Sequence, residues 1–293
     1  MIISKPEELK KHYLEGNEFI GAVPLMENSK LIINGKNNLL VCEDNVKLMD
    51  CYIEYKGNNS LIYLSNNKHY YKLSIDIYSN STIFIGRDNY FNRNLHAIIS
   101  EEQNFLIGNE CLFSTDIWVR NADAHLIYDI DTNKRINSSK SIFIGDRVWI
   151  GQDVFLFKGI EIDSGSIIGA KSMASNKRIG CNELWAGNPI RLIKKNVYWD
   201  NTCVHSFDKA KTKSSMKYSI NLNKDNKSVY SFNKNQCIPY NEIDKYFKSH
   251  TSIENYTFIK SKLVKETKNR FVHDSAQSQN LFNIIFKNKK GNN

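Results

Sequence analysis

Apolar residues recur at every sixth position between residues 142 and 175. The repeated positions are Ile144, Ile150, Leu156, Ile162, Ile168 and Ala174. A second apolar or small residue stands two places before each, which is the spacing of side chains on one face of a strand. Glycine and β-branched residues are frequent here and disfavour a helix. Three six-residue segments would close a triangular coil of about 18 residues, so the pattern predicts a β-solenoid whose stacked coils bury a continuous core.

The six-residue spacing continues upstream in a looser form. Ile107, Phe113 and Val119 keep the step. Strand-like runs begin at four asparagines, and their starts lie 21, 21 and 24 residues apart: Asn38, Asn59, Asn80 and Asn104. We therefore expect a solenoid from about residue 30 to residue 185, with irregular N-terminal coils. An ordinary β-sandwich over 30–100 is the alternative.

The two ends of the chain lack the repeat. Residues 1–16 have the signals of a short helix, with Pro6 near its start and Gly16 at its end. Beyond Trp199 a polar segment at 205–236 is expected to be irregular, and helices are expected around Ile243–Phe247 and Ile253–Val264. The expected organisation is an N-terminal helix and lead-in (1–29), a solenoid domain (30–199) with a loop at 120–141, and a C-terminal extension (200–293).

The charge of the chain is concentrated in that extension. The net charge is +9 over 293 residues, but residues 1–199 carry 23 basic and 23 acidic side chains, whereas residues 200–293 carry 17 and 8. Such a basic segment could attract an anionic polysaccharide, dock on an anionic inner membrane leaflet, or simply be solvated. Its interleaved aromatic residues also occur in single-strand nucleic-acid binders, but no recognisable module accompanies them, so no nucleic-acid partner is expected.

The cysteines and the N-terminus bear on the cellular compartment. The six cysteines are scattered without zinc or redox spacing. The start has no apolar run of signal-peptide length, and no apolar stretch reaches about 18 residues, so neither a leader nor a transmembrane helix is expected. These features favour a cytoplasmic protein without a metal.

A long segment interrupts the repeat between Val119 and Ile142, and loops on rigid scaffolds often carry function. His125 lies at the root of this loop and is the only histidine in or beside the regular repeat. Trp149 stands between inward Val148 and inward Ile150, so alternation turns its indole outward, where it needs a ligand or a neighbouring subunit.

Three stretches carry a family resemblance: His125-Leu-Ile-Tyr-Asp, the run Ile142-Phe-Ile-Gly-Asp-Arg-Val-Trp-Ile-Gly, and the closing Trp185-Ala-Gly-Asn-Pro-Ile-Arg191. In these the chain resembles the hexapeptide-repeat acyltransferases, most of all the branch that O-acetylates bacterial capsular polysaccharides such as polysialic acid. The resemblance implies a left-handed parallel β-helix, a homotrimer with active sites at subunit interfaces, and acetyl-CoA as co-substrate.

The resemblance also implies roles for individual residues. His125 would be the general base, a role that contributes typically 10²–10⁴-fold, and Trp149 would lie beside the thioester. Residues implied in coenzyme A binding are Trp149, Gly151, Ala170, Ser175, Lys177, Arg178 and Arg191. Relatives commonly have a threonine-lysine pair where this chain has Ser175-Asn176 followed by Lys177-Arg178, which leaves open which basic side chain meets the phosphate.

Each of these residues has a simpler interpretation. His125 could be hydrogen-bonded to Asp123 or Asp129 without reacting, or Asp123 could orient its imidazole. Trp149 could fill a subunit interface. Packing is the expected role of Trp118 and Trp185, and solvated charge that of Arg147 and Lys171.

The predicted function is acetyl transfer from acetyl-CoA to a hydroxyl of a bacterial surface polysaccharide, such as sialic acid residues of a capsule or lipooligosaccharide. Alternatives are an acetyltransferase for a small sugar or antibiotic, and a non-catalytic trimer that binds polysaccharide. A zinc enzyme of the γ-carbonic-anhydrase type is rejected because the coil offers only His125, whereas such a site needs several histidines.

Overall fold

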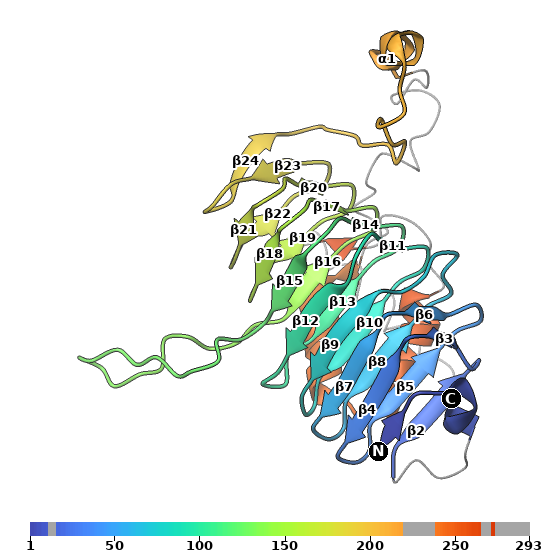
Figure 1. Cartoon of the computed structure of the whole chain (residues 1–293). Coiled ribbons are helices and arrows are strands. Elements are labelled where there is room, and N and C mark those ends of the chain that lie inside the picture. Colours follow the sequence, from blue (N-terminus) through green and yellow to red (C-terminus); the bar gives the residue numbers. More distant parts are fainter. Residues whose placement is uncertain (11–15, 219–237, 265–270, 273–293) are drawn as a thin grey trace, which may run out of the picture.

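The computed structural model describes residues 1–10, 16–218, 238–264 and 271–272. Its main body is a solenoid of stacked coils with three faces (Figure 1). Face one contains β1 (Ile2–Ile3), β4 (Lys30–Asn34), β7 (Tyr52–Lys56), β9 (Leu73–Ile77), β12 (Leu95–Ile99), β15 (Ile117–Arg120), β18 (Phe155–Phe157) and β21 (Met173–Ala174). Face two contains β2 (Glu18–Gly21), β5 (Leu39–Cys42), β8 (Leu61–Leu64), β10 (Thr82–Ile85), β13 (Phe105–Ile107), β16 (Ile142–Ile144), β19 (Glu161–Ile162) and β22 (Arg178–Ile179).

Face three is the least regular of the three. It contains β11 (Tyr90–Phe91), β14 (Leu112–Phe113), β17 (Trp149–Ile150), β20 (Ile167–Ile168), β23 (Leu184–Ala186) and β24 (Arg191–Lys194). The last of these strands, β24, runs antiparallel to β23. Two earlier strands, β3 (Leu25–Glu27) and β6 (Lys47–Met49), form a separate parallel pair.

Strand pairing confirms the predicted solenoid and its repeat length. In the C-terminal coils, Trp149 pairs in parallel with Ile167, 18 residues later. In the N-terminal coils the step is longer, as where Tyr52 pairs with Ser74, 22 residues later. The β-sandwich alternative for 30–100 is wrong, because each strand there pairs in parallel with the strand one coil away. The stack also begins before residue 30, since β2 pairs with β5.

The predicted inward positions form the core. The repeat residues Ile144, Ile150, Leu156, Ile162, Ile168 and Ala174 have no exposed surface. At the corners, asparagines such as Asn37, Asn59 and Asn80 adopt left-handed backbone angles, with φ between 56° and 59°. Asparagine tolerates this conformation better than most residues, which is one reason why it marks the turns of the N-terminal coils.

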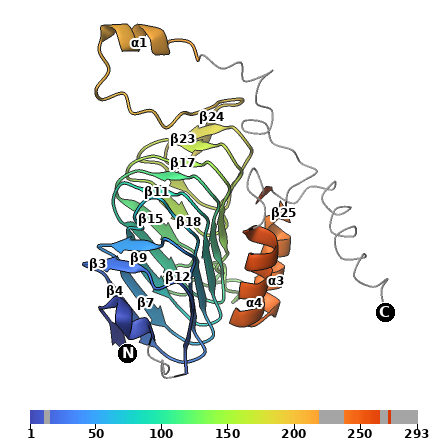
Figure 2. The ribbon, with the colours of Figure 1, turned by 90° about the vertical axis from the view of Figure 1, so that its right-hand side faces the viewer.

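Face two is covered by helices from the C-terminal extension (Figure 2). These are α3 (Tyr240–Ser249), α4 (Ser252–Phe258) and the π-helix η3 (Ile259–Leu263), where helices were predicted. Outward side chains of face two and apolar side chains of the helices bury one another: Leu39, Val41, Leu61, Tyr63, Phe84, Leu106 and Phe143 against Tyr240, Ile243, Phe247, Phe258, Ile259 and Leu263. This part of the extension is therefore docked on the solenoid and is not a solvated tail.

Two local predictions differ from the structure. The predicted irregular segment contains the helix α1 (Lys209–Ser215), which begins after Asp208 because its side chain accepts a hydrogen bond from the Lys211 amide; residues 219–236 of that segment lie outside the described ranges. The N-terminal helix is a short 3₁₀ helix at Pro6–Lys10, and residues 11–15 also lie outside those ranges. None of the described helices is long and apolar enough to span a membrane.

Candidate active site

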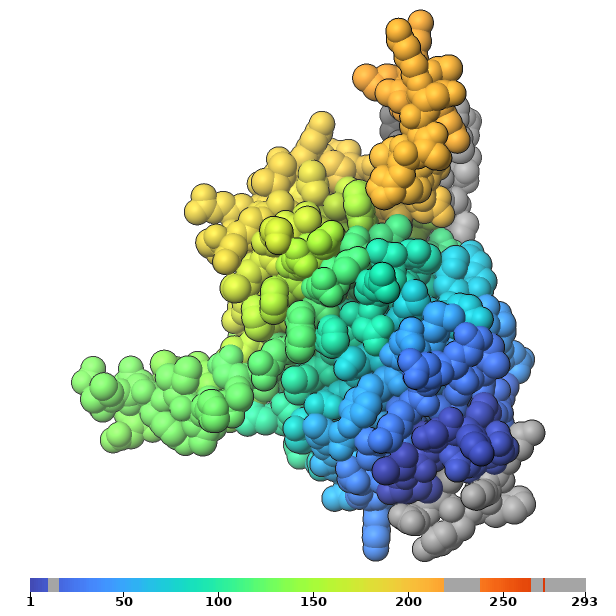
Figure 3. Space-filling model, viewed as in Figure 1, coloured from blue at the N-terminus to red at the C-terminus, as the bar shows by residue number. Residues whose placement is uncertain are grey.

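The loop that carries His125 projects far from the body as a narrow arm, green in Figures 1 and 3. It leaves the corner between faces one and two, after β15, and returns at β16. Its outer part is a hairpin in which the Asp129 amide donates to the Lys134 carbonyl and the Ile136 amide to the Ile127 carbonyl. Its apolar side chains are exposed: Leu126, Ile127, Tyr128, Ile130 and Ile136. A row of exposed apolar side chains on a projecting arm indicates a contact with another molecule.

Glu101 holds the base of the loop. Its carboxylate accepts two hydrogen bonds from the Arg135 guanidinium, at 2.8 and 2.9 Å, and another from the Ser139 hydroxyl. The hydrogen bonds from Arg135 and then from Ser139 lower the pKa of Glu101 to about 2. Because this pKa lies below that of a free glutamate, the contribution to stability is present above about pH 4.5 and is lost as the pH falls toward 2.

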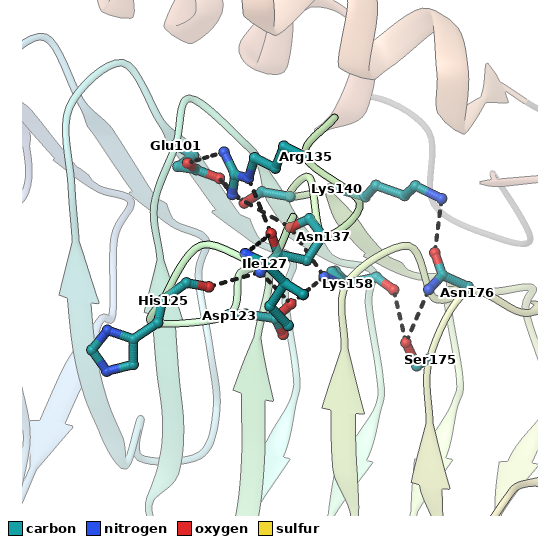
Figure 4. A network of polar contacts seen from close by, with 11 residues as sticks. Glu101, Asp123, His125, Ile127, Arg135, Asn137, Lys140, Lys158, Ser175 and Asn176 are labelled. Atoms are coloured by element: carbon teal, nitrogen blue, oxygen red, sulfur yellow. Dashed lines mark hydrogen bonds and ion pairs between the residues drawn. The ribbon is translucent and has the colours of Figure 1, made fainter. Parts of the chain in front are cut away.

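Asn137 fixes the backbone at His125 (Figure 4). The amide nitrogen of this buried side chain donates to the His125 carbonyl at 2.7 Å and to Asp123 at 3.0 Å, and its oxygen accepts from the Ile127 amide at 3.0 Å. The imidazole itself points away from this network, and the His125 side chain is exposed. The scaffold therefore holds the main chain of His125 while leaving the ring free for another molecule.

The carboxylate of Asp123 is engaged elsewhere. It accepts from Lys158 at 2.5 Å, and this interaction is the main reason why the pKa of Asp123 is lowered. Asp129 accepts from Thr132 at 2.8 Å. Among the residues that the structure describes, neither carboxylate is hydrogen-bonded to the His125 ring. The sequence-based expectations that Asp123 orients the imidazole, or that Asp123 or Asp129 sequesters it, are not seen in this chain.

Trp149 lies on β17 of face three and points outward, as predicted, with 38% of its surface exposed. Its indole nitrogen is 3.4 Å from the Ser114 hydroxyl, and its ring centroid is 6.2 Å from that of Trp199. Trp199 is buried and donates to the Arg147 carbonyl at 2.9 Å. One flank of Trp149 is thus bordered by the segment that follows the solenoid, and the rest is open.

Of the other surface residues that the sequence analysis considered, one is solvated and the rest are packed against neighbouring side chains. Arg147 is not simply solvated, because its guanidinium lies over the Tyr198 and Trp199 rings. Lys171 is exposed and pairs with Asp153 at 2.8 Å. Trp118 stacks on the ring of His96 and Trp185 packs against the core, so both have the packing roles expected of them.

Three of the candidate cofactor residues lie on the same side of the prism as Trp149. Gly151 follows β17 and is buried, and a Cβ there would be 2.6 Å from the backbone nitrogen of Ala170 in the next coil. Close stacking of the coils is therefore one physical reason for glycine at this position. Ala170 is exposed at the same corner, and Arg191 is exposed on β24.

The remaining candidates lie at the corner from which the loop leaves. The Ser175 hydroxyl is 3.5 Å from the Lys158 carbonyl, while Lys177 is exposed and Arg178 pairs with Glu161 at 3.3 Å. The candidate residues therefore form two groups on different sides of one chain. His125 belongs to the loop at the corner of faces one and two, whereas Trp149 lies on face three.

The outward sides of faces one and three are apolar in the C-terminal coils. On face three, five outward residues stand in register: Tyr90, Leu112, Trp149, Ile167 and Leu184. On face one, Trp118, Phe155 and Met173 form a similar row. Such rows are typical of surfaces that pack against another subunit.

Asp244 on α3 contacts the base of the loop, and the sequence analysis missed this contact. Its carboxylate accepts from the Ser141 hydroxyl at 2.5 Å and from the Asn104 side-chain amide at 2.9 Å. Ser141 is the last residue before β16, where the loop returns, so α3 is hydrogen-bonded to the base of the loop. No local signal predicts this contact, because Asp244 and Ser141 are 103 residues apart.

Comparison with known proteins identifies several relatives, although no protein-family model matches the chain. A polysialic acid O-acetyltransferase of Neisseria meningitidis is 27% identical over 187 residues, covering 64% of this chain and 86% of that protein. A polysialic acid O-acetyltransferase of Escherichia coli is 33% identical over 105 residues, but these cover only 36% of this chain and 34% of the relative.

Two solved structures resemble the fold. The polysialic-acid-specific acetyltransferase NeuO has 31% sequence identity and a TM-score of 0.59, and the match covers 68% of this chain and 93% of that one. The polysialic acid O-acetyltransferase OatWY has 25% identity and a TM-score of 0.52, over 65% of this chain and 94% of that one. Both structures are thus matched almost in full, while each alignment leaves about a third of this chain uncovered.

Proposed function

Because this chain belongs to the hexapeptide-repeat acetyltransferases that include the polysialic acid O-acetyltransferases, we propose that it transfers acetyl from acetyl-CoA to a hydroxyl of a bacterial surface polysaccharide. The acceptor we propose is a sialic acid residue of a capsule or lipooligosaccharide, since the relatives act on polysialic acid. The observation that carries the proposal is an exposed imidazole, His125, whose backbone is fixed by Asn137 at the base of the projecting loop.

His125 acts as the general base in this proposal. A sugar hydroxyl has a pKa far above 7 and attacks a thioester poorly unless its proton is removed in the transition state. A nitrogen of the His125 ring takes the hydroxyl proton while the hydroxyl oxygen bonds to the acetyl carbon. The bond from carbon to sulfur then breaks, the coenzyme leaves as a thiolate, and the imidazolium returns the proton to that sulfur. The products are the acetyl ester and coenzyme A.

The complete site is formed between two protomers of a homotrimer. His125 and Trp149 lie on different sides of one chain, so a cleft lined by both requires the loop of one protomer to reach face three of its neighbour. The exposed side chains of the arm and the outward row on face three are both apolar, as is typical of two surfaces that pack together. Contacts between two different surfaces close into a ring when the rotation between subunits is suitable.

Acetyl-CoA would lie along this cleft. Trp149 borders the acetyl end, and Gly151 and Ala170 mark the adjacent corner, where small residues let a pantetheine chain approach the backbone. The exposed side chains of Lys177 and Arg191, with Arg178 and Ser175, offer donors for the phosphates and their surroundings. A phosphate would compete with Glu161 for Arg178.

The exposed basic helix α1 supports an anionic acceptor. None of its residues is buried, so the charges of its lysines act through solvent and attract a polyanion over long range. We place the reaction in the cytoplasm, where acetyl-CoA is made. The same basic charge could hold the enzyme at an anionic inner membrane surface or near capsule machinery.

The test is an assay of free coenzyme A and product mass with acetyl-CoA and oligosialic acids. We expect His125→Ala to lower kcat by about 10²–10⁴-fold. The matched control is His205→Ala, which removes an exposed histidine outside the site and should leave kcat unchanged. Equal rates for His125→Ala and the wild type would refute the assigned base, and transfer only to small sugars or antibiotics would refute the polysaccharide acceptor.

A further inference from the structure

Arg120 is a half-buried cation at the base of the loop that carries His125. It is the last residue of β15, and the alternating burial of this strand places it on the outer side of face one. The residues beside it in register are Ile98 in the preceding coil and Phe157 in the next coil. Its neighbours along this outward row are therefore apolar.

The guanidinium of Arg120 has no ion pair or hydrogen bond with any residue that the structure describes. Its Nε is buried without an acceptor, whereas its two terminal nitrogens are not buried and can be reached from outside the protomer. A charged donor that is removed from water without an acceptor is unfavourable. Such a group is therefore expected where another molecule supplies the acceptor.

Two other cations at the base of the loop already have carboxylate partners. Arg135 pairs with Glu101 at 2.8 Å, and Lys158 pairs with Asp123 at 2.5 Å. The two carboxylates at the loop base are thus occupied by other side chains. The charge of Arg120 is therefore available to an anion that comes from outside the described part of the chain.

Arg120 and His125 belong to the same corner of one protomer. Phe157 pairs with Arg120 in register, and the following residue, Lys158, donates to the Asn137 carbonyl at 3.2 Å. The Asn137 side chain in turn donates to the His125 carbonyl at 2.7 Å. The corner beside Arg120 is therefore hydrogen-bonded to the segment that fixes His125, which places both side chains on the same edge of the protomer.

The chemistry of the guanidinium indicates which group it binds. Its nitrogens form a planar fork that matches the two oxygens of a carboxylate, and apolar neighbours lower the local dielectric constant, which strengthens such a pair. A sialic acid polymer, the proposed acceptor, carries one carboxylate on each sugar unit. A carboxylate is therefore available near the reacting hydroxyl wherever along the polymer that hydroxyl lies.

We propose that Arg120 binds a carboxylate of the acceptor and thereby selects sialic acid polymers over neutral sugars. The proposal rests on the proposed function, because it concerns recognition of the same acceptor. Arg120 is a specificity-determining residue in this account and takes no part in proton transfer, which stays with His125.

The test measures kcat/KM for oligosialic acid and for the same oligomer with its carboxylates converted to neutral methyl amides. We expect Arg120→Gln to lower kcat/KM for the anionic acceptor about 10- to 100-fold, because a charge-assisted pair is lost. Its KM for acetyl-CoA and its kcat/KM for the neutral acceptor should match those of the wild type. Arg120→Lys should recover only part of the loss, since an ammonium group keeps the charge without the planar fork.

Arg93→Gln is the matched control. It removes the same charge from an exposed position between β11 and β12, and it should leave all of these constants unchanged. Equal losses in Arg120→Gln and Arg93→Gln would overturn the proposal, because the effect would then come from net charge alone.

The same variants distinguish the other sources of an anion for Arg120. A carboxylate of a neighbouring protomer predicts weaker association of Arg120→Gln in sedimentation experiments, with equal losses for the anionic and the neutral acceptor. A phosphate of the coenzyme predicts a higher KM for acetyl-CoA. Either result would overturn Arg120 as the residue that binds the acceptor carboxylate.

A binding measurement separates this proposal from the proposed function. Calorimetry with oligosialic acid in the absence of acetyl-CoA should give a Kd about 10- to 100-fold higher for Arg120→Gln than for the wild type. Equal Kd values, or no binding to the wild type, would refute the role of Arg120 even if the enzyme proves active on another acceptor. Binding that depends on Arg120 but leads to no acetyl transfer would support that role and count against the proposed function.

Discussion

Face two and face three of this solenoid both carry outward rows of apolar side chains, yet among the residues that the structure describes only the row on face two is covered by the chain itself. On face two, the row that includes Phe84 and Phe143 is buried under α3, α4 and η3. On face three, the row that includes Trp149 is exposed in the protomer, and the upper part of face one is similar, with Phe155 38% exposed. The covered row serves the stability of the protomer, and the exposed rows are available to other copies of the chain.

The two halves of the candidate site lie on these two kinds of face, one covered and one exposed. The loop leaves the edge of the covered face, where Asp244 of α3 contacts its base, whereas Trp149 stands in an exposed row. We infer that the helices support the half of the site that the protomer builds alone. In the proposed trimer, the exposed rows supply the half of the site that requires assembly.

The largest expected effect is on the covered face. Phe247 of α3 is 2% exposed in the cluster with face two, and truncating a buried phenylalanine typically costs about 3–5 kcal/mol. Phe247→Ala should lower the free energy of unfolding by that amount, measured by chemical denaturation. Phe155→Ala, the same change on the exposed row, should cost about 1 kcal/mol or less in the protomer and should weaken association in sedimentation experiments.

Equal losses of stability for these two variants at concentrations where the protein is monomeric would contradict the comparison. So would a Phe155→Ala variant whose oligomeric state matches the wild type at every concentration.

The sequence predicted the interior of the solenoid because six-residue spacing is a local property. Each inward residue, such as Ile144 or Ile162, has its partners one coil away, at a fixed distance along the chain. The cover on face two was not predictable in this way. Outward residues such as Phe84 look like part of a continuous apolar strand, and their partners on α3 and α4 lie far away in the sequence.

A smaller effect is expected at the contact between helix and loop. Asp244→Ala leaves the Ser141 hydroxyl and the Asn104 amide without their acceptor, at a cost of about 1–3 kcal/mol. We expect faster tryptic cleavage in the loop after Lys134 and Arg135, and a lower kcat with an unchanged KM for acetyl-CoA. A positioning role predicts this pattern, whereas a purely structural one predicts loss of stability alone.

Lys245→Ala is the control for that variant, because Lys245 is exposed on the same helix. Glu101→Gln should have the smallest effect, about 1 kcal/mol or less, since its pair with Arg135 is partly exposed to solvent, which screens the charges. If trypsin cleaves the loop of Asp244→Ala no faster than that of Lys245→Ala, α3 does not hold the loop in place.

The candidate site was predictable only in part. The interruption of the repeat located His125, and strand alternation predicted the outward Trp149, because both depend on local pattern. Asn137 and Asp244 were missed, since each acts through a contact that depends on how the loop and the helix fold back. The separation of His125 from Trp149 within one chain was also not visible, because the repeat does not reveal which face a neighbour occupies.

Mixing two inactive variants tests the account most directly. His125→Ala and Trp149→Ala are each expected to be inactive alone, and they should be combined by co-expression or by unfolding and refolding together. If the site lies between protomers, mixed trimers contain sites with both native residues, and about a quarter of the wild-type activity should return. If the mixture is as inactive as its components while mixed trimers are shown to form, His125 and Trp149 do not share a site across the interface.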